Sequence, residues 1–323
     1  MPYSWAVQCR NRRYDRGGVE RLEVPVVSVG NLTLGGTGKT PTVAWLAEWF
    51  QRQGRRPAIV SRGYRSGSQA WNDEALELAQ RLPNIPQVQN PDRIVASRQA
   101  IARFGCDIIL LDDGFQHRRL GRDLDLVLLD ATEPFGFEHV FPRGTLREPL
   151  SGLSRADVVV LSRANLLTAP QRSSIRQRVA QLAPTAQWLE IAQTPTHFLN
   201  SSRQKQALDV LRGPPLAAFC GIGNPSGFQQ MLQSSGFDVA VFRTFPDHHP
   251  FSTEDTESIA RSAAAAGAEA VVCTHKDLVK FEQDRLNGIP FWALVIETEV
   301  LSGQEQLLEL LRSLLEARPA GSG

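Results

Sequence analysis

The sequence predicts an α/β protein with a mostly parallel sheet in its first half and a second, smaller α/β region behind it. Three observations support this. Short apolar runs alternate with helix-like segments, the runs are apolar at nearly every position, and a glycine-rich loop separates the first run from the first helix. Strands that are buried on both faces have continuous apolar runs of this kind, as in parallel sheets covered by helices.

The elements follow in order along the chain. The first helix is expected over 40–54, because Val43, Leu46, Ala47 and Phe50 recur at helical spacing and Gly54 can end the helix. Helix-like segments are also expected at 227–236 and 258–267. The expected strands are 24–29, 57–61, 107–113, 124–130 and 157–162 in the first half, and 215–223, 238–242, 268–275 and 291–297 in the second. The pattern breaks at 194–212, so we predict domains at 1–195 and 212–323 joined by a linker at 196–211.

Composition restricts the class of protein. The net charge is +1, so no overall field favours nucleic acid as a partner. Because no apolar stretch approaches about 18 residues and no signal peptide begins the chain, the sequence predicts a cytoplasmic protein. The four cysteines are scattered without metal-ligand spacing and suit free thiols: Cys9, Cys106, Cys220 and Cys273. Residues 1–22 carry an arginine excess, which is either a solvated helix end or a basic edge for a phosphorylated substrate or an anionic membrane.

The strongest motif is VGNLTLGGTGKTP at 29–41, which follows an expected strand and precedes a helix. Its glycines allow backbone N–H groups to approach phosphate oxygens, while the N-terminus of the helix attracts the same anion. Lys39 would pair with the β- and γ-phosphates of ATP, and the Thr40 hydroxyl would ligate Mg²⁺. The usual first glycine of the pattern is Thr33 here. The residues expected to bind the nucleotide are Thr33, Leu34, Gly35, Gly36, Thr37, Gly38, Lys39 and Thr40.

A second motif, IILLDDGFQH at 108–117, ends an expected buried strand with Asp112 and Asp113. The carboxyl ends of parallel strands lie together, so one of these carboxylates should reach the Mg²⁺ near Thr40. Strand-end aspartates are common, and a surface pair is the alternative.

With both motifs present, the chain resembles the tetraacyldisaccharide 4'-kinases. The matching segments are VSVGNLTLGGTGKTP, SRGY, NDE, PDR, LLDDGFQHRRLGRDLD, RGTLREP, FCGIGNPSGF and FPDHHPF. The resemblance implies transfer of the γ-phosphate of ATP to the 4'-hydroxyl of a tetraacylated glucosamine disaccharide 1-phosphate, giving lipid IV-A. It also implies a RecA-like P-loop domain, a smaller α/β domain that closes over it, and a two-stranded link.

The resemblance assigns catalysis to two residues. The family's catalytic aspartate matches Asp92 of PDR, and its partner histidine matches His248 of PDHH. A carboxylate tuned by an imidazole can accept the proton of a sugar hydroxyl, and residues from two domains would assemble only on closure. His249 is the alternative histidine and can equally be a packing residue.

Other motif residues are expected to line the cleft or to be ordinary ion pairs: Arg62, Tyr64, Asp73, Glu74, Arg118, Arg119, Arg147 and Glu148. Two departures from the family pattern stand out. Asn72 replaces the usual glycine before Asp73 and Glu74, and the N-terminal segment is short. Its small apolar patch and arginines predict weak, peripheral contact with the inner face of a bacterial inner membrane.

Other readings of the P-loop are a different ATPase, a GTPase, a ligase of the dethiobiotin synthetase kind, or a nucleotide-dependent switch without catalysis. A GTPase would carry an NKxD element to read guanine, and THKD at 274–277 is the nearest approach. A switch would need no base for an acceptor hydroxyl, so Asp92 and His248 would be replaceable.

Overall fold

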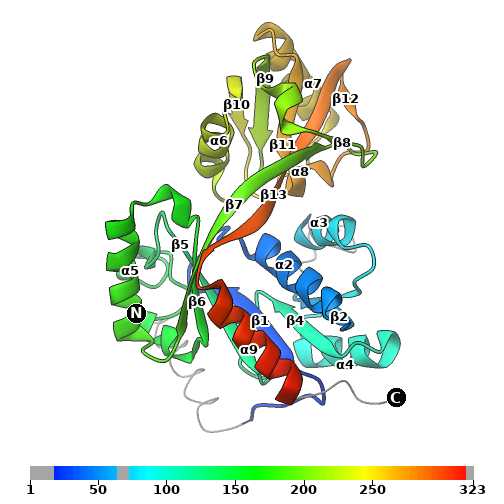
Figure 1. Ribbon diagram of the computed structural model, residues 1–323. Helices are drawn as coiled ribbons and strands as arrows, with labels where there is room; N and C mark the ends of the chain where they lie inside the picture. The colour runs from blue at the N-terminus through cyan, green and yellow to red at the C-terminus, as the bar shows by residue number, and fades with distance from the viewer. Residues whose placement is uncertain (1–17, 64–72, 318–323) are drawn as a thin grey trace. The chain divides into compact units, whose positions relative to one another are not determined.

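The computed structural model describes residues 18–63 and 73–317, which form two compact units. Unit 1 comprises residues 18–63, 78–193 and 298–317, and unit 2 comprises residues 73–77 and 194–297 (Figure 1). Several residues singled out from the sequence lie outside the described residues: Cys9, Tyr64, Asn72 and the N-terminal arginines up to Arg16.

The sheet of unit 1 has the strand order β7-β6-β5-β1-β4-β2-β3, and each neighbouring pair is parallel. This confirms the expected α/β class with a mostly parallel sheet. The first strand ends at Asn31, so the glycine-rich loop leaves the carboxyl edge of the sheet. The strands are β1 (Val26–Asn31), β2 (Pro57–Ser61), β3 (Gln87–Gln89), β4 (Ile108–Asp112), β5 (Leu124–Asp130), β6 (Val158–Ser162) and β7 (Gln187–Leu199).

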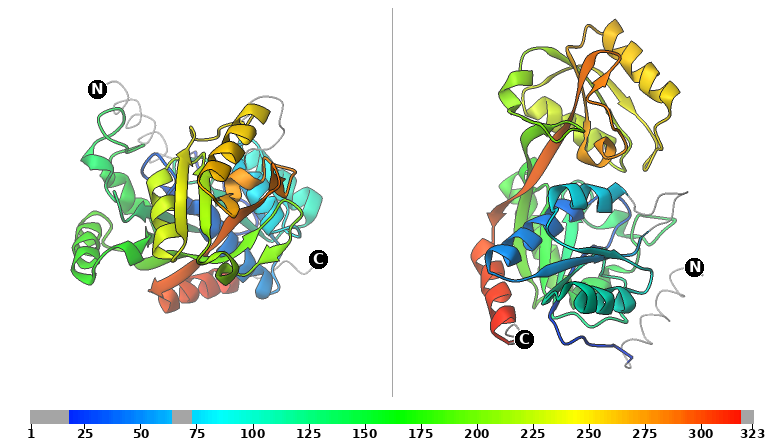
Figure 2. Two further views of the ribbon diagram at one scale, coloured as in Figure 1. Left: turned by 90° about the horizontal axis from the view of Figure 1, so that it is seen from above. Right: turned by 90° about the vertical axis from the view of Figure 1, so that its right-hand side faces the viewer.

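Helices cover both faces of this sheet. Successive side chains of a strand point to opposite faces, so neighbouring residues of one strand pack against different helices. Val27 packs in one core with residues of α2, α3 and α9, whereas its neighbour Val26 packs in another core with α4. Val127 of β5 packs in a third core with α5. Figure 2 shows these helices around the sheet in two further views. The helices of unit 1 are α2 (Lys39–Arg52), α3 (Asp73–Arg81, shared with unit 2), α4 (Arg93–Phe104), α5 (Ala169–Leu182) and α9 (Gln304–Ala317), with short 3-10 turns η1 (Gly136–Glu138), η2 (Leu150–Arg155) and η3 (Ala164–Leu166).

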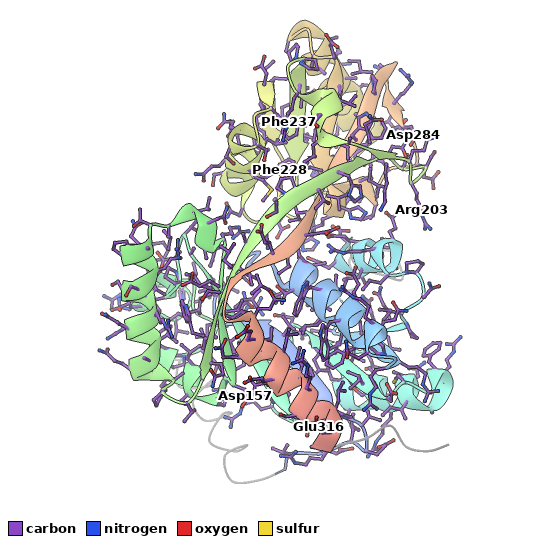
Figure 3. The ribbon with its side chains drawn as sticks, viewed as in Figure 1. Asp157, Arg203, Phe228, Phe237, Asp284 and Glu316 are labelled. Carbon is purple, nitrogen blue, oxygen red and sulfur yellow. The ribbon has the colours of Figure 1, made fainter. Side chains whose placement is uncertain are left out.

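Unit 2 contains a parallel sheet of order β10-β9-β11-β13 with an aromatic core. The Phe219 ring stacks on Phe291 with centroids 5.8 Å apart, and Phe251 meets Phe219 edge-on. On the other face of the sheet, Phe228 and Phe237 belong to a second apolar core (Figure 3). The elements are β8 (Lys205–Gln206), η4 (Leu208–Leu211), β9 (Pro215–Cys220), α6 (Pro225–Ser234), β10 (Asp238–Thr244), α7 (Thr253–Ala265), β11 (Ala270–Thr274), α8 (His275–Leu278), β12 (Arg285–Leu286) and β13 (Ile289–Ser302).

The division of the chain differs from the expected one at its C-terminal end. The chain passes between the units inside two strands, after Gln193 in β7 and after Glu297 in β13. Helix α9 therefore belongs to unit 1, where Leu307 and Leu311 are buried in the same core as α2. The segment expected as a linker, 196–211, includes the last part of β7, β8 and η4 and lies within unit 2. The sequence pattern predicts one domain from 212 onward, because it does not indicate that the leucine-rich helix α9 packs in unit 1.

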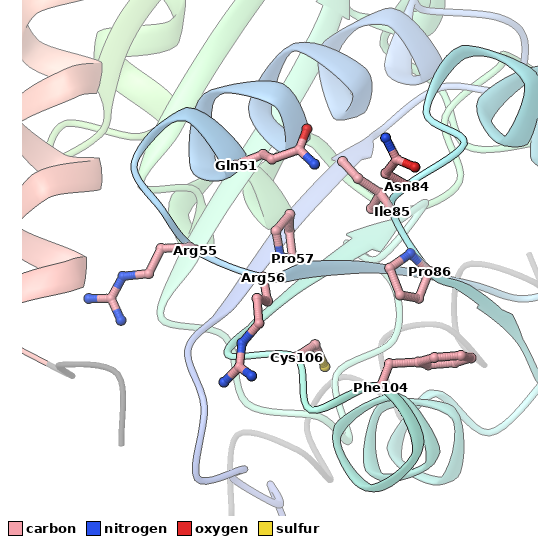
Figure 4. Close-up of a pocket in the computed structure, with 9 residues that line it drawn as sticks. All are labelled: Gln51, Arg55, Arg56, Pro57, Asn84, Ile85, Pro86, Phe104 and Cys106. Carbon is pink, nitrogen blue, oxygen red and sulfur yellow. The ribbon is translucent and has the colours of Figure 1, made fainter. Parts of the chain in front are cut away.

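One hollow in unit 1, of about 240 Å³, lies away from the glycine-rich loop. Figure 4 shows it between the end of α2 and the start of β2, where Pro57 begins the strand and Cys106 precedes β4. It is therefore at the amino edge of a parallel sheet, opposite the edge where ligands of such folds bind. Burial raises the pKa of the Cys106 thiol to about 11, so this cysteine is a poor nucleophile at neutral pH.

Candidate active site

The glycine-rich loop leaves an open space suited to a polyanion. Gly38 precedes α2 with a φ of 86°, and a Cβ at this position would overlap the side-chain amide of Gln193. Gly35, with a φ of 107°, and Gly36 both have nothing within 4 Å of the position of a Cβ. The backbone in this part of the loop is thus accessible, as a phosphate cradle requires.

The start of the loop is held by the RGTLREP segment. Thr33 pairs with Leu146 in an isolated antiparallel bridge. The Leu34 N–H donates to the Thr145 carbonyl at 2.7 Å, and the Arg147 N–H donates to the Leu32 carbonyl at 2.7 Å. These bonds hold residues 32–34 in an extended, strand-like conformation. A threonine can adopt this conformation, so the usual glycine is not required at position 33.

Two further residues support the loop, and neither was expected from the sequence. Arg163 follows β6 and donates from Nη2 to the Gly36 carbonyl at 2.9 Å, while its Nη1 pairs with Asp130 at the end of β5. The Gln193 side chain is buried against Gly38. Arg163 directly follows a strand, a place that many polar residues share, and Gln193 lies in the middle of β7, so the sequence carries no specific signal for either.

Lys39 lies beside two polar side chains at the glycine-rich loop, those of Asn31 and Asp113. Its Nζ is 3.4 Å from Asn31 Oδ1 and 3.5 Å from Asp113 Oδ1. Arg147 Nη1 donates to both oxygens of Asp113 at 2.8 Å. Burial alone would raise the pKa of Asp113, but Lys39 and Arg147 outweigh it and lower that pKa to about 2. Asp113 is therefore ionised at neutral pH and available as a ligand for a cation.

The donors around Lys39 fit a magnesium ion that also binds phosphates. Thr40 is the second residue of α2, Asp112 ends β4, and Asp113 follows it. The buried Thr37 hydroxyl has no hydrogen-bond partner in the part of the chain that the structure describes, and it could donate to a phosphate oxygen. Within residues 18–63 and 73–317, no group of three or more aspartate, glutamate, histidine or cysteine side chains is placed to hold a metal ion. Mg²⁺ takes one or two carboxylates together with phosphates and water, and a hydroxyl and two carboxylates are present at Thr40, Asp112 and Asp113.

Asp92 lies at the N-terminus of α4 and is held from two sides. Its Oδ1 accepts from the Ile94 N–H at 3.0 Å and the Val95 N–H at 3.4 Å, so it caps the helix. Its Oδ2 accepts from Arg119 at 3.0 Å. Partial burial raises the pKa of Asp92, but the two backbone N–H groups and Arg119 outweigh it, so the pKa is lowered.

The other expected cleft residues have different surroundings. Glu148 is buried and accepts from Arg155 and Gln116, so it is part of an internal ion pair. Arg62 is exposed at the end of the first described range. In unit 2, His248 is bonded to Asp73 and His249 is bonded to Asp255, each through one ring nitrogen.

Comparison with known proteins identifies the family. The family model described as tetraacyldisaccharide-1-P 4'-kinase matches residues 1–316. The chain belongs to this kinase family. A tetraacyldisaccharide 4'-kinase of Anaeromyxobacter sp. (strain K) is 39% identical, with 98% of this chain and 89% of the relative covered. The enzyme of the same name from Bdellovibrio bacteriovorus is 32% identical, covering 97% of this chain and 96% of the relative. A crystal structure of LpxK from Aquifex aeolicus in complex with ATP matches with a TM-score of 0.75 and 29% identity, over 97% of this chain and 96% of the other.

Membership of the tetraacyldisaccharide-1-P 4'-kinase family makes this chain a kinase, as the motifs predicted, and disfavours the GTPase reading. The THKD segment agrees, because Asp277 is fully buried and accepts from the Gly221 N–H and the Thr274 hydroxyl. Its carboxylate is thus not available to read a base. Among the described residues, no helix is long and apolar enough to cross a membrane.

The contact between Arg163 and the loop gives a first testable expectation for this kinase. Arg163→Met removes the donor to Gly36 and should weaken ATP binding by about tenfold. One charge-assisted hydrogen bond contributes about 1.5–3 kcal/mol, and only part of that reaches ATP, because Arg163 acts by ordering the loop. Isothermal titration calorimetry measures this. Arg172→Met is the matched control, because Arg172 also binds a carbonyl (Leu167, 2.6 Å) and a carboxylate (Glu190, 3.0 Å) but supports no loop residue. Equal losses in both variants would contradict a specific role for Arg163.

Proposed function

We propose that this kinase transfers the γ-phosphate of ATP to the 4'-hydroxyl of a tetraacylated glucosamine disaccharide 1-phosphate and gives lipid IV-A. The observation that carries the proposal is the group of Lys39, Asp113 and Arg147 beside an open glycine-rich loop, in a chain of this family. Backbone N–H groups and an ammonium can neutralise a triphosphate there.

The residues have distinct roles in the proposed reaction. Lys39 would leave Asp113 and neutralise charge on the β- and γ-phosphates as the bond between them breaks. Thr40, Asp112 and Asp113 would hold Mg²⁺, which when bound adds positive charge at the phosphates. The 4'-oxygen forms the new bond to phosphorus, ADP leaves, and Asp92 accepts the hydroxyl proton.

We propose His248 as the partner of Asp92, on the strength of the family match. Asp92 belongs to unit 1 and His248 to unit 2. The family match and the lipid nature of the acceptor also support peripheral association with the inner face of a bacterial inner membrane.

One experiment tests both the reaction and the association. The protein is incubated with radiolabelled ATP, Mg²⁺ and the tetraacyl disaccharide 1-phosphate in anionic liposomes. Thin-layer chromatography is expected to show a labelled glycolipid that requires acceptor, and flotation of the same sample should place the protein with the liposomes. Release of phosphate without a labelled glycolipid would contradict the kinase reaction. Protein that stays in the dense fraction would contradict the association alone.

A further inference from the structure

His248 has a backbone conformation that the surrounding residues hold in place. Its φ is 61°, in the left-handed region that is costly for a residue with a side chain. Its N–H donates to the Gly221 carbonyl at 3.2 Å. The Gly221 N–H in turn donates to Asp277, which is fully buried. The loop that carries the histidine is therefore fixed to the end of β9.

The imidazole ring is bound through Nδ1 to Asp73 within unit 2. The distance from Nδ1 to Asp73 Oδ2 is 3.1 Å, and Asp73 is 8% exposed. Burial raises the pKa of Asp73, but its bonds to His248 and Lys280 outweigh it and lower the pKa. An ionised carboxylate can only accept, so the hydrogen of this bond is on Nδ1 of His248.

Lys280 holds both the carboxylate and the loop. Its Nζ is 2.8 Å from Asp73 Oδ2, 3.2 Å from the His249 carbonyl and 3.4 Å from Asp277 Oδ1. Its side chain is 9% exposed. One buried ammonium thus ties the partner of the ring to the backbone that follows the ring, so neither can move alone.

The opposite nitrogen, Nε2, faces charged groups of both signs. Lys276 Nζ is 3.3 Å away, Glu74 Oε1 is 3.5 Å away and Asp247 Oδ2 is 3.9 Å away. Lys276 also pairs with Glu74 at 2.9 Å and with Asp247 at 3.0 Å, so the two carboxylates hold its ammonium in place beside Nε2. The nearest carboxylate oxygen is thus 3.5 Å from Nε2 but 3.1 Å from Nδ1, so a proton on Nδ1 leaves Nε2 as the acceptor nitrogen, which the Lys276 ammonium approaches.

We propose that Asp73, held by Lys280, is a positioning residue that keeps a proton on Nδ1 of His248 and so leaves Nε2 as the nitrogen that takes part in phosphoryl transfer. The proposal rests on the proposed function of His248. A carboxylate that fixes the tautomer and angle of a working histidine serves many enzymes in this way. The hydrogen bond to Asp73 also raises the pKa of His248. It outweighs partial burial and Lys276, which both lower that pKa.

The neighbouring histidine supplies a matched control. His249 Nε2 is 2.9 Å from Asp255 Oδ2, and the His249 ring packs between Phe245 and Phe251. Asp255 also accepts from the Ser252 N–H and hydroxyl at the start of α7. This pair has the chemistry of an aspartate–histidine contact inside an aromatic core, where its role is packing and helix capping.

The first test follows the ring itself and does not need activity. With ¹⁵N-labelled histidine, the His248 signals, assigned with His248→Gln, should show the Nδ1–H tautomer in the neutral form. In Asp73→Asn the pKa of His248 should fall, because its main acceptor has lost its charge, and the tautomer should shift towards Nε2–H. Asp255→Asn should leave the His248 signals unchanged. Unchanged His248 signals in Asp73→Asn overturn the proposal, whether or not the chain phosphorylates a lipid.

The second test is kinetic. Asp73→Asn should lower kcat about tenfold, with little change in KM for ATP. The loss is smaller than the factor of about 10²–10⁴ that an acid–base group itself contributes, because Asp73 acts only through His248. In a His248→Gln background, Asp73→Asn should lower kcat no further, because the two residues act as one unit. Lys280→Arg should retain more activity than Lys280→Met. Additive losses in the double variant would show that Asp73 acts apart from His248, and circular dichroism melts identify a variant that is merely unfolded.

Discussion

Lys39→Ala is expected to reduce phosphoryl transfer by about 10²–10³-fold or more, the loss that follows removal of one preorganised group that stabilises transition-state charge. The ammonium lies between Asn31 and Asp113, so it is already at the mouth of the loop. Without it, Asp113 keeps Arg147 as its cation. The rate of labelled glycolipid formation under saturating ATP measures the loss.

The control for Lys39 is Lys205→Ala. Lys205 is an exposed lysine of β8 in unit 2, so the same charge is lost away from the loop. It should transfer phosphate at close to the parent rate. A Lys39→Ala variant as active as Lys205→Ala would contradict the role of Lys39 in neutralising the transferred phosphate.

The parts of the fold that sequence reasoning predicted are those with a local pattern. The expected strands 57–61 and 124–130 have the same bounds in the structure, because each is a continuous apolar run with polar residues or turns at its ends. Strand 24–29 is displaced to Val26–Asn31, since Asn31 continues the pairing with β5 although it is polar. The expected strand 291–297 is longer in the structure, Ile289–Ser302. Its last residues are alternately exposed, so they do not continue the apolar run that predicts a strand.

The candidate site divides in the same way. The loop residues and the two aspartates could be predicted as site residues because their spacing is a property of one short segment. Arg163 is 127 positions from Gly36, and Asp73 is 175 positions from His248. No periodicity connects such residues, and an arginine or aspartate at the end of an element is usually a surface residue. Only the folded chain identifies these partners.

Asp92 has two roles that one pair of substitutions can separate. Its carboxylate caps α4 through the N–H groups of Ile94 and Val95, and in the proposed reaction it accepts a proton. Asparagine is as good a helix cap as aspartate, but its amide cannot accept the proton. Alanine can do neither.

Asp92→Asn is therefore expected to keep its thermal stability and lose about 10²–10³-fold in kcat. The lower part of the range for a general base is expected, because the transition state of phosphoryl transfer is loose and needs little activation of the hydroxyl. Since contacts lower the pKa of Asp92, it is ionised at neutral pH, and the loss should be similar across the neutral range. Asp92→Ala should lose as much in rate and also about 1 kcal/mol in stability.

The control is Asp209→Asn, which neutralises an aspartate that pairs with Arg212 at 2.6 Å, as Asp92 pairs with Arg119. Asp209 is 80% exposed, and its variant should match the parent enzyme in both rate and melting temperature. The decisive comparison is between the two Asp92 variants. If asparagine restores the rate along with the stability, Asp92 is a helix cap and the proton goes elsewhere. If it restores only the stability, the carboxylate charge itself is what the reaction requires.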